Sequence, residues 1–79
     1  VSTFPNPAVT KLYFSFETNN LHLLIVEIFK LTGQPILTII PNDKQYILDV
    51  ASMDEGIYFY KVLYNGKLVK TEKIMIIKG

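Results

Sequence analysis

The stretch MDEGIYFYKV, residues 53–62, decides the fold of this chain because a turn passes directly into a dense aromatic strand. Acidic residues and glycine are typical of turns, whereas aromatic and β-branched residues are typical of strands. In immunoglobulin-like sandwiches, a tyrosine at such a place bonds to the backbone of the preceding corner. We therefore predict that Tyr58 fixes a corner formed by Asp54 and Gly56.

The side chains of this strand are expected to alternate between its two faces. The inward set is Tyr58, Tyr60 and Val62, and the outward set is Ile57, Phe59, Lys61 and Leu63. Lys61 suits a solvated face, but Phe59 and Leu63 leave an apolar strip there. Two interpretations stay open: a loop or a neighbouring side chain covers the strip, or a partner does.

The rest of the chain repeats the pattern of short strands separated by turn residues, with no sustained helical periodicity. Gly33 can adopt a tight turn, and Asn65-Gly66 is a strong hairpin signal. The pattern predicts an all-β fold, a small antiparallel immunoglobulin-like β-sandwich of about seven strands. The expected strands cover residues 11–17, 23–31, 35–40, 45–50, 57–64 and 67–77, the last as one long strand or two short ones.

The chain of 79 residues has the size of one small domain. Pro5, Asn6 and Pro7 form a stiff stretch, so residues 1–8 are predicted to be a linker or leading segment and residues 9–79 the β-sandwich. Because the chain begins at Val1, we expect it to be a piece of a longer protein.

Several functional classes are disfavoured by the composition. The net charge is +1 and every cation is lysine, whereas specific nucleic-acid readout favours arginine, so no nucleic-acid partner is expected. No apolar run approaches the roughly 20 residues that span a bilayer. The chain has no cysteine, and His22 is its only histidine. We therefore expect no catalysis, no metal and no cofactor.

The C-terminal stretch carries a different signal, a short apolar run bracketed by lysines. The run covers residues 74–77, and the lysines around it are Lys67, Lys70, Lys73 and Lys78. A run that is apolar on both faces suits a covered strand. It equally suits an edge strand that adds to the sheet of a partner, with the lysines opposing aggregation.

Taken in order, these markers closely resemble those of the type A C-terminal sorting domain of proteins exported by the type IX secretion system of Bacteroidetes. They are Phe4-Pro5-Asn6-Pro7, Leu31-Thr32-Gly33, Asp49-Val50, Gly56-Ile57-Tyr58-Phe59, Asn65-Gly66-Lys67 and Lys73-Ile74-Met75-Ile76-Ile77-Lys78. The resemblance covers nearly the whole chain. Two departures are Glu55, where a small residue or proline is common, and Gly79 after the usual closing lysine.

The resemblance implies a non-catalytic signal that directs an N-terminal cargo domain across the outer membrane. The cargo is in transit through the periplasm and ends at the cell surface or secreted. Implied partners are the type IX translocon and a sortase-like peptidase, which commonly removes the domain and can join the cargo to an anionic lipopolysaccharide. The implied recognition residues are Pro5, Asn6, Pro7, Gly56, Tyr58, Lys67, Lys70, Lys73, Ile74, Ile76, Ile77 and Lys78.

Two alternatives remain open at this point. One is a carbohydrate-binding or surface-binding accessory sandwich that uses exposed Tyr13, Phe59 or Tyr64 as a stacking platform. The other is a structural spacer domain, which would require chain on both sides.

Overall fold

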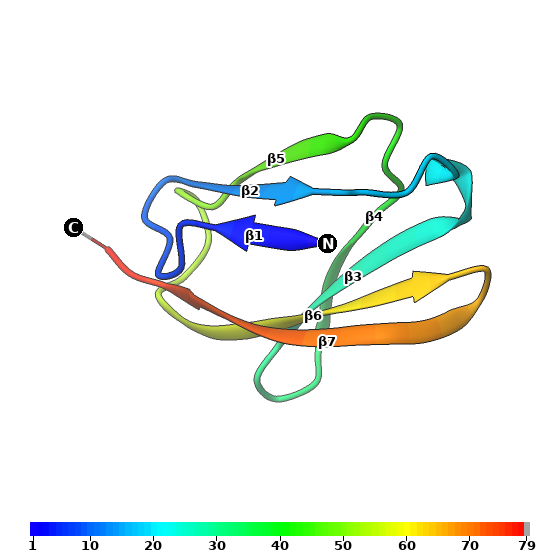
Figure 1. Cartoon of the computed structure of the whole chain (residues 1–79). Coiled ribbons are helices and arrows are strands. Elements are labelled where there is room, and N and C mark those ends of the chain that lie inside the picture. The colour runs from blue at the N-terminus through cyan, green and yellow to red at the C-terminus, as the bar shows by residue number, and fades with distance from the viewer. Residues whose placement is uncertain (79) are drawn as a thin grey trace.

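The computed structural model describes residues 1–78 as two stacked antiparallel sheets (Figure 1). The elements are β1 (Ser2–Phe4), β2 (Lys11–Ser15), the 3₁₀ turn η1 (Leu21–Leu23), β3 (Leu24–Lys30), β4 (Pro35–Ile39), β5 (Gln45–Asp49), β6 (Gly56–Tyr64) and β7 (Lys67–Ile76). One sheet has the order β1-β2-β5 and the other β4-β3-β6-β7. The predicted all-β sandwich of seven strands is confirmed. Gly79 lies outside the described residues.

The core lies between the sheets and is built from alternate side chains of the central strands. The inward set of β6, Tyr58, Tyr60 and Val62, is buried as predicted. The ring of Tyr60 packs edge-on against Phe14 of β2, with 5.3 Å between the ring centroids. This contact joins the two layers, because Phe14 and Tyr60 belong to different sheets.

The apolar strip on the outward face of β6 is partly covered by side chains of the same sheet. Phe59 stacks on Phe29 of β3, with their centroids 5.3 Å apart. The ammonium of Lys61 lies 4.8 Å from the centroid of the Phe29 ring, so the cation lies over an aromatic face. Neighbouring side chains therefore cover part of Phe59, which remains half-buried like Leu63, and a partner contact with the rest of the strip stays open.

The β6–β7 hairpin turns at Asn65 and Gly66, whose φ angles are 52° and 80°. Positive φ at both positions is the requirement of a type I′ turn, so the predicted turn is confirmed. The stretch after the turn is one long strand, β7, rather than two short ones. Its pairing with β6 shifts between Val62 and Leu63, which lets β7 carry an extra residue without being broken in two.

The first eight residues lie within the sandwich. β1 pairs with β2, and Ala8 is fully buried and forms an isolated parallel bridge to Ile76 on the edge of β7 that faces away from β6. These residues therefore have structural contacts of their own. Their additional role as the connection to a preceding cargo stays a prediction.

Candidate recognition site

Three segments that are distant in the sequence meet at one end of the sandwich (Figure 1). They are residues 5–8 in the β1–β2 loop, residues 51–58 in the β5–β6 corner and start of β6, and residues 73–78 at the end of the chain. We call this region the terminal cluster. It contains most of the recognition residues that the sequence resemblance implies.

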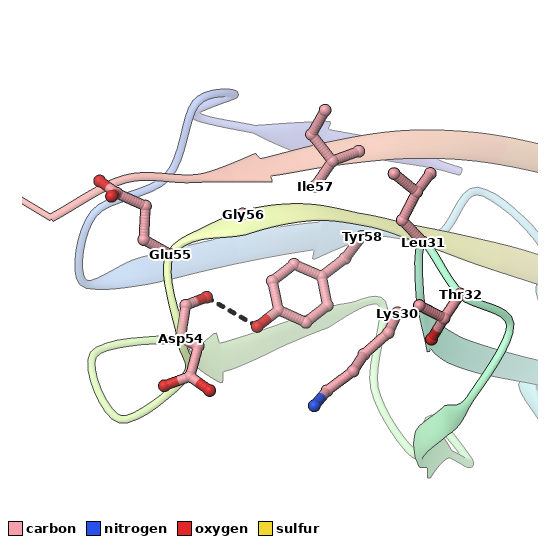
Figure 2. Close-up of a pocket in the computed structure, with 8 residues that line it drawn as sticks. All are labelled: Lys30, Leu31, Thr32, Asp54, Glu55, Gly56, Ile57 and Tyr58. Atoms are coloured by element: carbon pink, nitrogen blue, oxygen red, sulfur yellow. Dashed lines mark hydrogen bonds between the residues drawn. The ribbon is translucent and has the colours of Figure 1, made fainter.

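The corner is fixed by the side chain of Tyr58, as the sequence predicts. Its ring is buried, and its hydroxyl donates a hydrogen bond of 2.6 Å to the backbone oxygen of Asp54 (Figure 2). Burial, and secondly the charge of the Asp54 carboxylate, raise the pKa of the Tyr58 phenol. The hydroxyl therefore keeps its proton and remains a donor at physiological pH.

Gly56 follows this corner with a φ of 153°, a conformation that L side chains rarely adopt. The corner residue before it, Glu55, accepts a hydrogen bond of 3.0 Å from the backbone N–H of Lys78. The ammonium of Lys78 donates to the backbone oxygen of Ala51 at 2.6 Å. The end of the chain is thus held on the corner at two points. Sequence reasoning noted Glu55 only as a departure, because nothing local relates it to Lys78.

The segment between the two leading prolines is held on the other side of the terminal strand. Asn6 Nδ2 donates to the backbone oxygen of Lys73, and Asn6 Oδ1 accepts from the backbone N–H of Met75, both at 3.0 Å. Ala8 continues the contact, donating to the oxygen of Met75 at 2.8 Å and accepting from the N–H of Ile77 at 2.9 Å. The predicted proline-flanked segment and the predicted terminal strand are therefore in direct contact.

The implied residues of the terminal strand divide into a buried set and an exposed set. Ile74 and Ile76 point into the core and are almost fully buried. Lys73, Ile77 and Lys78 are exposed. The first two side chains support the fold, and the last three, with Met75 beside them, are accessible to a partner.

Two of the implied lysines lie outside the terminal cluster. Lys67 begins β7 beside the Asn65-Gly66 turn, at the far end of the strand. The ammonium of Lys70 donates to the backbone oxygen of Val1 at 2.5 Å and lies 4.0 Å from a carboxylate oxygen of Glu72. The lysines thus follow the length of β7 and do not form one basic patch.

A shallow pocket lies against the corner (Figure 2). It is lined by Lys30, Leu31, Thr32, Asp54, Glu55, Gly56, Ile57 and Tyr58. The markers 31–33 and 56–59, which are separate in the sequence, therefore contribute to one surface. The lining combines one basic and two acidic side chains with apolar ones.

The aromatic residues of the alternative carbohydrate platform do not share a surface. Tyr13 stacks on Phe4 in the three-stranded sheet, with 5.2 Å between the centroids. Phe59 lies on the outward face of the other sheet, stacked on Phe29. The hydroxyl of Tyr64 accepts a hydrogen bond from Asn20 at the start of η1. A row of rings for stacking a glycan is therefore not formed by these residues.

Within residues 1–78, the acidic residues and the one histidine form no group of three that could hold a metal ion. In the same part of the chain, no helix is long and apolar enough to cross a membrane.

The protein is a small β-sandwich in which three distant segments meet in the terminal cluster. The accessible side chains of this cluster are suited to contact with another protein. The chain belongs to the family of secretion-system C-terminal sorting domains, whose family model matches residues 2–78. It is a C-terminal sorting signal for type IX secretion, and this family is not catalytic. A search of curated proteins finds no match to the chain.

A domain of this family implies attachment to a cargo, contact with the type IX secretion machinery and export across the outer membrane. The prediction of a C-terminal sorting signal is thus confirmed by the family to which the chain belongs.

Proposed function

We propose that the type IX translocon reads this domain at the terminal cluster, through the accessible side chains of the 54–58 corner and of residues 73–78. The main support for this proposal is that Lys78 forms hydrogen bonds to Glu55 and Ala51 of the corner. A receptor that contacts the corner therefore contacts the closing residues at the same time. Such a surface exists only in the folded domain, so it distinguishes a folded sorting signal from an unfolded cargo.

The residues of this surface have different tasks. Lys73 and Lys78 supply exposed positive charge, and Ile77 supplies apolar contact. Gly56 and Tyr58 hold the corner in shape. Ile74 and Ile76 keep the terminal strand in register from inside the core. Lys67 adds an exposed positive charge at the hairpin end of β7, and Lys70 connects this strand to Val1.

We further propose that the segment Pro5-Asn6-Pro7 marks the boundary between the domain and its cargo. A sortase-like peptidase of the cell surface cuts the chain upstream of β1 after passage through the periplasm, so that this strand stays paired with β2. The cargo then stays at the cell surface or is released. The contact of Asn6 with β7 supports a role for this segment at the edge of the sandwich, and β1 is the only strand that precedes it in the described residues.

The recognition surface is tested by the double substitution Lys73→Ala and Lys78→Ala in a reporter fused to residues 1–79, in a host with type IX secretion. We expect a fall of at least about tenfold in exported reporter, since both side chains are exposed and opposite charge is commonly read at a contact surface. The purified variant should keep its circular dichroism spectrum and lose little melting temperature, because the bond from Lys78 to Ala51 is exposed to solvent and the backbone N–H of Lys78 still donates to Glu55.

The matched control is Lys44→Ala, which removes an exposed lysine from the β4–β5 loop outside the terminal cluster. Its export should equal that of the unsubstituted fusion. Equal export of the double variant would count against the proposed surface. Loss of folding in the double variant would assign the two lysines to stability instead.

A further inference from the structure

The outer edge of β7 is covered along only part of its length. β7 is the last strand in the order β4-β3-β6-β7, so one side of its backbone has no neighbouring strand. Residues 5–8, which we call the edge clasp, lie along that side near Lys73, Met75 and Ile77. Figure 1 shows the β1–β2 loop reaching the end of β7.

The edge clasp imitates a paired strand. The amide side chain of Asn6 offers one donor and one acceptor to Lys73 and Met75, as a backbone peptide group would. The backbone of Ala8 then supplies the next pair, to Met75 and Ile77. Pro5 and Pro7 have no backbone N–H, so the clasp cannot itself extend into a regular strand of the sheet.

The other part of the edge, toward the hairpin, has open backbone groups. Because the outward backbone groups of an antiparallel strand alternate, Thr71 presents its N–H and oxygen on the same side as Lys73 and Met75. No residue of the part described by the structure bonds to them. Leu68 and Val69 beside this stretch are 57% and 60% exposed. An unpaired edge of this kind is a template for another strand.

Two features indicate that the clasp can be displaced. Asn6, Pro5 and Pro7 are exposed, and both hydrogen bonds of the Asn6 side chain are exposed to solvent. Exposed hydrogen bonds contribute little net stability, because water replaces them at small cost. Only Ala8 is buried.

We propose that a strand supplied by the export machinery pairs first with the open edge at Thr71 and then replaces the edge clasp up to Ile77. This inference rests on the proposed function and specifies how β7 is read. The incoming partner is an extended peptide, since the groups that now bond to this edge are the backbone of Ala8 and the side-chain amide of Asn6, which resembles a peptide group. It carries acidic side chains, because Lys67 and Lys73 are exposed on β7, whereas the only acid of the strand, Glu72, already lies 4.0 Å from the ammonium of Lys70.

A disulfide between the edge clasp and β7 tests whether the clasp must detach from β7 for export. The chain has no cysteine, and Ala8 and Ile76 are directly opposed partners. The double substitution Ala8→Cys and Ile76→Cys places two cysteines on adjacent backbones, within the Cα spacing of a disulfide. In the reporter fusion, we expect the oxidised double variant to be exported at least about tenfold less than either single-cysteine variant.

The controls separate this inference from the proposed function. Bond formation is checked by gel mobility with and without reductant, and folding by circular dichroism of the purified protein. Export of the locked variant at the level of the single variants would overturn strand replacement and leave the recognition surface intact. Failure of the unsubstituted fusion to be exported would overturn both.

A second measurement needs no export assay. In the purified chain, Asn6→Ala should speed hydrogen exchange of the Met75 N–H about tenfold, since Asn6 Oδ1 is its acceptor. The N–H of Val50, which donates to Thr10 at 2.9 Å away from the clasp, serves as internal reference. Unchanged exchange at Met75 would show that Asn6 does not cover the edge and would overturn the inference.

Discussion

Tyr58 links β6 to the corner before it through a buried ring and one hydrogen bond to the oxygen of Asp54. The two contributions are separable by substitution. Removing the whole ring leaves a cavity in the core, whereas removing only the hydroxyl leaves the packing intact.

We expect Tyr58→Ala to lower the free energy of unfolding by about 3 to 5 kcal/mol, the usual cost of deleting a large buried aromatic. Tyr58→Phe should cost only about 1 kcal/mol, the net value of one hydrogen bond. Urea unfolding of the purified variants measures both. An unchanged melting temperature for Tyr58→Ala would show that the ring contributes nothing to the core, against its observed burial.

Single residues also show where sequence reasoning reached its limit. The inward position of Tyr58 follows from strand alternation and is confirmed. The contact of Asn6 with Lys73 could not be predicted, because 67 positions separate them. A local pattern identifies which face of a strand is buried. It does not identify which distant side chain meets the edge of that strand.

At the scale of elements, the β6–β7 hairpin determines the position of the terminal strand. Its turn places Tyr64 opposite Lys67, and the pairing then continues to Gly56 opposite Ile76. A change in the turn is therefore transmitted to the whole of β7, including the residues at the terminal cluster.

The turn makes a direct prediction at Gly66, whose φ is 80°. Gly66→Ala should lower the free energy of unfolding by about 1 to 2 kcal/mol, because a side chain is disfavoured in this left-handed region. Asn65→Gly is the matched control and should be nearly neutral, since glycine adopts the positive φ of 52° without strain. Thermal unfolding measures both. Equal melting temperatures for Gly66→Ala and the unsubstituted chain would contradict the type I′ assignment.

The strands were largely predictable from the sequence, but the pairing between them was not. Turn residues and alternation indicated β2 to β7 to within a few residues. The short strand β1 was missed because residues 1–8 hold two prolines and only three residues pair with β2. The pairing of Thr3 with Phe14 depends on tertiary contacts that no local preference reports.

For the whole molecule, the fold explains how a chain of this size can act as a separate signal. The core is continuous between the two sheets and includes Ala8 near one end of the sequence and Ile76 near the other. Both ends of the domain are thus tied to the same structure, so the terminal cluster forms when the domain folds and does not depend on the cargo. A small domain has low overall stability, so loss of a buried contact at one end of the domain should also weaken the contacts at the other end.

The central claim is that residues 1–79, once folded, are sufficient to direct export. It is tested by measuring the fraction of a fluorescent reporter that leaves the periplasm when the reporter carries a signal peptide and this domain, in a host with type IX secretion. The account predicts that the reporter reaches the cell surface or the medium only when the domain is present. Periplasmic retention identical to that of the reporter without the domain would contradict it.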